Sequence, residues 1–463
     1  MLVSGRRTYE LISTAPRFIK LSVRQKSAKF KRKVARSLPL KSPTALALDH
    51  FDFYYGPLFG KQWPSVRLGL LSPHKYIAVA NIFSSSPDIN EAILRERGAF
   101  NLLDQLLSVK TSPLTETASR EPDGNDEEKR QSFKAEDSPK LVLEVDETPR
   151  DESGLNEFRP STKTFTLGEL KSGEHRKRRD ITITGFEGQG LVVPKENHRI
   201  NYPENLKLYV YPRGDLTDFP SPDKDTTGVP TWWLLDGGSI VPVLALNLEK
   251  GETLLDMCAA PGGKSLLAAQ TLLLDKLVCN DAKMSRLGQL RRALASFIPS
   301  VTGMADRIIL KRKDAADLTA WNELEAYDKV LVDAPCTTDR LSLSVDENNI
   351  FSVNMTTERL NLPILQTKLL INGLRSLKVG GSLVYSTCAL SPVQNEVVVE
   401  NAIAIAAERF DIKAVELSLD ELVVDLSRLR LYKINRCKLG FLVVPFLPSN
   451  FGPMYFCKLK RVI

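Results

Sequence analysis

The fold class can be predicted from residues 251–281, GETLLDMCAAPGGKSLLAAQTLLLDKLVCND. A short apolar run ends in Asp256, a Gly-rich turn and an apolar helical segment follow, and a second strand-like run ends in Asp281. The same alternation continues, with strand-like runs at 307–314, 327–335 and 380–388 and helical segments at 283–297, 358–377 and 393–410. This alternation predicts an α/β domain with a doubly wound, mostly parallel sheet.

A Gly-rich turn follows the first of these strands. In a doubly wound sheet, ligands bind beyond the carboxyl ends of the strands, and the turn at 256–264 lies at such an end. Gly262 and Gly263 let a ligand approach the backbone, and the start of the next helix offers unpaired N–H groups. A P-loop would need glycine where this chain has Cys258, six residues before Lys264, so a Walker-type ATPase is disfavoured.

Acidic residues follow the second and third strands. Asp281 can accept hydrogen bonds from both hydroxyls of a ribose, or it can serve as a helix N-cap. Asp314 can accept from the amino group of an adenine, or it can be a cap or turn residue. Together with the Gly-rich turn, these residues predict a site for a nucleoside-containing cofactor that has no pyrophosphate.

Two cysteines follow the fourth and fifth strands and should face one crevice. Cys336 lies in Asp333-Ala334-Pro335-Cys336, and Cys388 ends Ser386-Thr387-Cys388. A lone cysteine is usually a small buried hydrophobe, but two at neighbouring strand ends indicate nucleophiles. The chain has six cysteines, no C-x-x-C pair and four histidines, so we expect no metal site.

Four motifs in this region resemble those of the Nop/Sun RNA cytosine-5 methyltransferases: DMCAAPGGKS (256–265), NDAKMSR (280–286), VDAPCTTDR (332–340) and YSTCALSPVQNEVVVENAI (385–403). The resemblance covers 237–463. It extends more weakly to 48–81 and 238–252, which together with PCTTDR are similar to the mitochondrial ribosomal-RNA branch of the family. It implies a Rossmann-like class I fold, with a mostly parallel seven-stranded sheet and helices on both faces. It also implies S-adenosylmethionine as the cofactor.

The resemblance also implies roles for individual residues. Cys388 would be the nucleophile that adds to cytosine C6, and Cys336 would assist product release. Asp333 would hydrogen-bond the edge of the cytosine and lie near the cofactor. The cofactor would be held by Cys258, Gly262, Gly263, Lys264, Asp281, Arg286, Asp314, Ala315 and Asp333. Lys264 could instead be a surface residue at a helix N-terminus.

The charge of the chain is concentrated at its start. Residues 1–48 contain twelve Lys/Arg and one acid, so the formal charge of +7 divides into +11 here and −4 in the rest. The first 40 residues are basic, have apolar residues at helical spacing and lack a long apolar run. This pattern predicts a mitochondrial transit peptide at 1–40 and a place in the mitochondrial matrix. The alternative is a basic RNA-binding arm or a nuclear localisation patch around residues 29–33.

The remaining segments differ in composition. We expect an N-terminal helical region at 43–108, a disordered acidic linker at 109–165, a pre-catalytic extension at 166–236 and the catalytic domain at 237–463. The linker prediction rests on 115–158, which hold fourteen acids and six bases and few residues that could enter a core. No run of about 18 apolar residues occurs, so membrane insertion is not expected.

The resemblance implies an enzyme that methylates a cytosine of mitochondrial small-subunit ribosomal RNA and supports assembly of the mitochondrial ribosome. Because the body of the chain carries a charge of −4, tight unaided binding to RNA is doubtful. The resemblance implies a partner of the mTERF helical-repeat family. Two alternatives stay open: a transfer-RNA cytosine-5 methyltransferase of the same family, and a non-catalytic ribosome-assembly factor that keeps the fold.

Overall fold

The computed structural model describes residues 41–111, 193–215 and 217–463. From Ser42 onward the described residues belong to one compact unit, Ser42–Ile463. The predicted transit peptide and nearly all of the predicted acidic linker lie outside the described residues. Helix α4, Leu102–Thr111, continues three residues past the predicted start of that linker at 109.

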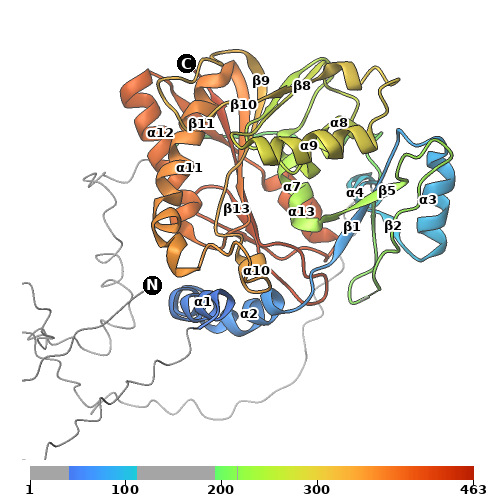
Figure 1. Ribbon diagram of the computed structural model, residues 1–463, viewed down its shortest axis with the longest axis horizontal. Coiled ribbons are helices and arrows are strands. Elements are labelled where there is room, and N and C mark those ends of the chain that lie inside the picture. The colour runs from blue at the N-terminus through green and yellow to red at the C-terminus, as the bar shows by residue number, and fades with distance from the viewer. Residues whose placement is uncertain (1–40, 112–192, 216) are drawn as a thin grey trace, which may run out of the picture. The chain divides into compact units, whose positions relative to one another are not determined.

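The centre of the fold is a ten-stranded sheet (Figure 1). Five adjacent strands are parallel, in the order β8-β7-β6-β9-β10. They are β6 (Thr253–Asp256), β7 (Lys276–Asn280), β8 (Ile308–Lys311), β9 (Tyr327–Asp333) and β10 (Leu377–Thr387). The predicted runs at 251–257, 276–281, 307–314, 327–335 and 380–388 contain these strands or overlap them.

The sheet has more than seven strands because β14 pairs with two different strands along one of its edges. β14 (Met454–Arg461) is antiparallel to β10, and its other edge is shared by two strands. Its second half pairs with β11 (Ala414–Leu417), which completes the seven-stranded core, and its first half pairs with β13 (Phe441–Val443). The additional strands are β13, β12 (Ile434–Arg436) and the two-residue β3 (Lys195–Glu196).

Helices cover both faces of this sheet (Figure 1). Along β9, Leu331 belongs to the apolar cluster that contains residues of α7, α8, α9 and α13, whereas Val330 and Val332 belong to the cluster that contains residues of α11 and α12. This alternation of side chains, with both sets buried, matches the almost wholly apolar run of β9. The bounds are α7 Gly237–Leu246, α8 Gly263–Gln270, α9 Met284–Phe297, α11 Thr356–Ser376, α12 Glu396–Phe410 and α13 Asp420–Arg428.

A second, antiparallel sheet has the order β2-β4-β1-β5. Its strands are β1 (Tyr76–Ala80), β2 (Phe100–Asn101), β4 (Leu208–Val210) and β5 (Trp232–Asp236), and α3 (Pro87–Glu96) contacts β1. The N-terminal region was expected to be largely helical, and it also contains β1 and β2. These strands are short and their partners are distant in the chain, so the local spacing of apolar residues does not predict them.

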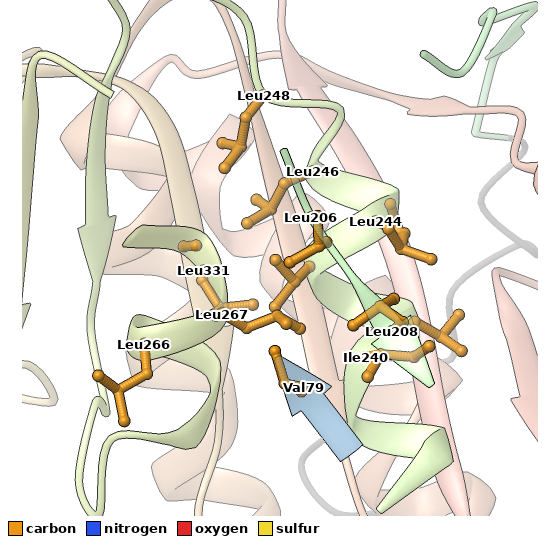
Figure 2. Close-up of a cluster of buried hydrophobic side chains, with 14 of the residues drawn as sticks. Val79, Leu206, Leu208, Ile240, Leu244, Leu246, Leu248, Leu266, Leu267 and Leu331 are labelled. Carbon is orange, nitrogen blue, oxygen red and sulfur yellow. The ribbon is translucent and has the colours of Figure 1, made fainter. Parts of the chain in front are cut away.

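The second sheet packs against the helices of the catalytic domain. In Figure 2, Val79 of β1 lies next to Leu267 of α8, and Leu208 of β4 lies next to Ile240 of α7; Leu244 of α7 belongs to the same cluster. All five side chains are at most 3% exposed. The N-terminal region and the segment before α7 therefore share one core with the catalytic domain.

Two N-terminal helices, α1 (Pro43–Phe59) and α2 (Trp63–Leu71), lie beside the short helix α10 (Asp339–Ser342) (Figure 1). The side chain of Ser42 caps α1 by accepting from Ala45 N at 3.3 Å. The described residues also contain four 3₁₀ turns: η1 Gly60–Gln62, η2 Ala305–Arg307, η3 Val353–Met355 and η4 Pro392–Gln394. Across 41–111, 193–215 and 217–463, no helix has the length and apolarity needed to cross a membrane.

Candidate active site

The carboxyl ends of the parallel strands are tied together by Asn280, the last residue of β7. Its Nδ2 donates to Met257 O and to Lys313 O, both at 3.0 Å, and its Oδ1 accepts from Lys313 N at 2.9 Å. These bonds join the loops that follow β6, β7 and β8 into one edge. Asn280 was not among the expected site residues, although its place directly before Asp281 could have suggested a role.

The Gly-rich turn after β6 leads into α8. Gly262 has φ +121°, and a Cβ atom there would lie 2.9 Å from Leu290 Cδ1, so only glycine fits this position. No side chain caps the N-terminus of α8. The first turn can therefore bind the carboxylate of a ligand such as the methionine end of S-adenosylmethionine. Burial raises the pKa of the Cys258 thiol in this turn, which keeps it protonated at neutral pH.

Asp281 is a buried carboxylate directly after β7, with 4% of its surface exposed. One oxygen accepts from Lys283 N at 2.9 Å, and the other lies 3.5 Å from Arg286 Nε. Arg286 also donates to Ala260 O, so it joins this carboxylate to the Gly-rich turn. The N-cap of α9 is Lys283, so Asp281 is not the cap. A carboxylate held in this way suits the hydroxyls of a ribose.

Asp314 and Ala315 follow β8. Asp314 is exposed, and its Oδ1 accepts from Ala316 N at 2.9 Å, as in the turn alternative considered for it. Ala315 is buried, and its carbonyl accepts from Asn372 Nδ2 at 2.8 Å. The bonds of Asn280 to Lys313 keep this loop next to Asp281.

Cys336 and Cys388 are brought together, with their Sγ atoms 3.2 Å apart. Strands β9 and β10 are parallel with Asp333 opposite Ser386; Cys336 follows the end of β9 by three residues, and Cys388 directly follows the end of β10. Both side chains are partly exposed. The contact with Cys336, together with burial, raises the pKa of the Cys388 thiol. Cys388 therefore needs a nearby proton acceptor before it can act as a thiolate.

Asp333 is held by two donors beside the cysteines. Lys264 Nζ donates to Oδ2 at 2.8 Å, and Ser386 Oγ donates to Oδ1 at 2.7 Å. Burial alone would lower the pKa of Lys264, but the charge and the hydrogen bond of Asp333, together with the nearby Cys388 and Asp256, outweigh it and raise that pKa. The Lys264 side chain is only 12% exposed, so it is not a surface residue and instead links the Gly-rich turn to the loop after β9. Ser386 was not among the expected site residues.

Asp256 is the last residue of β6, at the start of the Gly-rich turn, and is 1% exposed. Its Oδ2 accepts from Ser265 Oγ at 2.6 Å, and its Oδ1 has no hydrogen-bond partner among the described residues. Burial raises the pKa of Asp256 to about 7. The site thus contains a carboxylate that changes its charge near neutral pH.

Comparison with known proteins gives the family. Residues 243–441 match the family model described as 16S rRNA methyltransferase RsmB/F. The "5-cytosine rRNA methyltransferase nsun-4" of Caenorhabditis elegans is 52% identical over 457 residues, which cover 95% of this chain and 97% of that protein. The "5-cytosine rRNA methyltransferase NSUN4" of Mus musculus is 35% identical over 443 residues, covering 94% of this chain and 93% of that protein.

More distant similarities were also found. A "tRNA (cytosine(34)-C(5))-methyltransferase, mitochondrial" of Danio rerio is 35% identical over 269 residues, covering 58% of this chain and 70% of that protein. Among solved structures, NSun6 from Pyrococcus horikoshii with SFG is 18% identical and has a TM-score of 0.46, covering 89% of this chain and 98% of that one. This chain belongs to the Nop/Sun, or RsmB/F, family of S-adenosylmethionine-dependent RNA cytosine-5 methyltransferases.

Proposed function

We propose that this chain methylates C5 of a cytosine in mitochondrial small-subunit ribosomal RNA. The observation that carries the proposal is the pair Cys336 and Cys388, with Sγ atoms 3.2 Å apart beside an anchored Asp333. The relatives that match nearly the whole chain are named 5-cytosine rRNA methyltransferases, whereas the similarity to the transfer-RNA enzyme covers 58% of it. This difference favours a ribosomal substrate.

Residues of the three strand ends would hold the cofactor. Gly262, Gly263 and Lys264 would surround the methionine end, Asp281 with Arg286 would hold the ribose, and Cys258, Asp314, Ala315 and Asp333 would complete the site. When bound, S-adenosylmethionine supplies an electrophilic methyl group.

The two cysteines would divide the covalent chemistry. Cytosine C5 is a weak nucleophile, and addition of the Cys388 thiolate to C6 turns it into an enamine carbon. After C5 carries the new methyl group, its proton leaves and the C6–S bond breaks, which regenerates the cysteine. Cys336, with its Sγ atom 3.2 Å from that of Cys388, is close enough to take the C5 proton and so to assist this elimination.

Asp333 would bind the base and support its change of charge. With one oxygen bound by Lys264 and the other by Ser386, its carboxylate is fixed in orientation. It can accept a hydrogen bond from the edge of the cytosine and favour protonation at N3. The target base must leave its stack to reach both cysteines.

The proposed setting is the mitochondrial matrix, with a role in assembly of the mitochondrial ribosome. The basic residues of 1–40 support import, and the Danio rerio relative named as a mitochondrial transfer-RNA enzyme agrees with that compartment. Because residues 49–463 carry a charge of −4, a basic partner would help to hold the RNA. A protein of the mTERF family is the proposed partner.

Bisulfite sequencing of mitochondrial RNA, with and without the protein, tests the reaction. We expect loss of methylation at one small-subunit cytosine. Loss at a transfer-RNA cytosine instead would identify the other substrate class. No change at any cytosine would reject catalysis in favour of a non-catalytic assembly role.

Variants of the two cysteines test their separate roles. We expect Cys336→Ala to accumulate a covalent RNA adduct, because addition proceeds while elimination is slowed, and Cys388→Ala to form none. Denaturing gel electrophoresis with labelled RNA detects the adduct. Cys437→Ala is the matched control, because Cys437 is equally a partly buried free thiol but lies outside the pair. An adduct in Cys388→Ala would reverse the assignment.

A further inference from the structure

Asp339 is a fully buried carboxylate that lies between the two cysteine loops. Its Oδ2 accepts from Leu390 N at 2.8 Å, two residues after Cys388, and its own backbone N–H donates to Cys388 O at 3.3 Å. Its Oδ1 accepts from Thr337 Oγ1, in the residue after Cys336. One side chain thus bonds to the loops after both β9 and β10.

The turn that carries Cys336 needs such support. Thr338 has φ 45° and ψ 58°, a left-handed conformation that is strained for a β-branched residue. Ser342 N donates to Thr338 O at 2.9 Å, and Ser342 Oγ donates to Thr337 O at 2.7 Å. A strained turn keeps its shape only while the surrounding bonds hold it. Loss of the bonds to Asp339 would therefore let this turn relax and displace Cys336.

Tyr55 adds a bond from a remote part of the chain. Its hydroxyl, 284 residues earlier in sequence, donates to Asp339 Oδ2 at 2.7 Å. The ring is 2% exposed and packs against Phe51 and Trp63, with ring centroids 5.0 and 5.7 Å away. Burial and the charge of Asp339 raise the pKa of Tyr55, so the hydroxyl remains a donor.

We infer that Asp339 is a positioning residue for the two-cysteine centre, and that Tyr55 makes this positioning depend on helix α1. The inference rests on the proposed roles of Cys388 and Cys336. Asp339 touches neither base nor cofactor in this scheme and acts by keeping the two Sγ atoms aligned. The motif PCTTDR thus receives a physical role through its Asp339.

The variant Tyr55→Phe tests the inference, because it deletes only the hydroxyl and leaves the buried ring. Loss of one hydrogen bond to a charged group should lower kcat by about tenfold. The KM for S-adenosylmethionine should stay unchanged, because the hydrogen bonds that join Tyr55 and Asp339 to the cysteine loops go to Thr337, Cys388 and Leu390, none of which is a proposed cofactor residue. Asp339→Asn should lower kcat further, because an amide cannot accept at both of its terminal atoms.

Tyr202→Phe is the matched control. Tyr202 is also a buried tyrosine whose hydroxyl donates to a buried aspartate, Asp425, at 2.9 Å, but this pair lies between the segment before α7 and helix α13. We expect this variant to keep the wild-type kcat. An equal loss of kcat in both tyrosine variants, alongside an equal loss of stability, would mean a general structural effect and would overturn the inference.

Single-turnover adduct formation separates this inference from the proposed function. In a Cys336→Ala background, the adduct should form about tenfold more slowly when Tyr55→Phe is added. Equal adduct rates together with an unchanged kcat would overturn the positioning role. If Cys336→Ala alone formed no adduct, the proposed assignment of the cysteines would fail, and the kcat of Tyr55→Phe would still decide the positioning role.

Discussion

The substitution Asp256→Asn should change how the stability of this protein depends on pH. Asp256 is 1% exposed, one of its oxygens accepts from Ser265, and the other has no partner among the described residues. Burial raises the pKa of Asp256 from its ordinary value of 3.8 to about 7. Asparagine has nearly the same shape, can still accept from Ser265 and carries no charge at any pH in this range.

The sign follows from proton binding. Between about pH 4 and pH 7 the folded protein holds a proton on Asp256 that the unfolded chain has released, so raising the pH favours unfolding. At 1.36 kcal/mol per pH unit, the two pH units from 5 to 7 correspond to about 3 kcal/mol. Above pH 7 both states have lost the proton, and the contribution no longer changes.

Urea unfolding of the full-length protein at several pH values between 5 and 8.5 measures this contribution. The free energy of unfolding of Asp256→Asn, minus that of the wild type, should rise by about 3 kcal/mol between pH 5 and 8. Other titrating groups cancel in this difference. The exposed Asp306, changed to asparagine, should show a flat difference. If the difference in the free energy of unfolding between Asp256→Asn and the wild type also stayed constant with pH, the pKa of Asp256 would not be raised in the folded protein.

Two further variants test packing and cofactor binding. Gly237→Ala would place a Cβ atom 2.5 Å from Phe451 Cγ and should lower the free energy of unfolding by about 1–3 kcal/mol. The control Gly303→Ala, whose Cβ atom would have no neighbour within 4 Å, should leave the free energy of unfolding unchanged. Urea unfolding measures both variants. Asp281→Asn should weaken binding of S-adenosylmethionine by about tenfold in calorimetry, because an amide can accept at only one terminal atom, and Asp306→Asn should bind normally. Unchanged binding by Asp281→Asn would remove this residue from the cofactor site.

Much of the catalytic fold could be predicted from local sequence. The five runs expected as parallel strands lie at β6 to β10, and the expected helices match α8, α9, α11 and α12. Such elements can be predicted because burial on one face, or on both, imposes a regular spacing of apolar residues on the sequence. The short, scattered strands of the second sheet carry no such period. For this reason β1 and β2 were not expected within the N-terminal region, which was predicted to be helical.

The candidate site shows the same division. Cys336 and Cys388 could be expected to meet because the ends of neighbouring parallel strands share one edge of a sheet. Their supports could not be expected. Lys264 reaches Asp333 across 69 residues, and Tyr55 reaches Asp339 across 284.

The alternating strands and helices and the motif residues at the strand ends could be predicted from the sequence, because both follow from short-range periodicity and spacing. How the side chains around the cysteines are held depends on the folded chain, because hydrogen bonds between distant segments form only where those segments pack together. Asp339 illustrates the difference: it stands in a recognisable motif, yet its bonds to Leu390 and Tyr55 exist only in the folded chain.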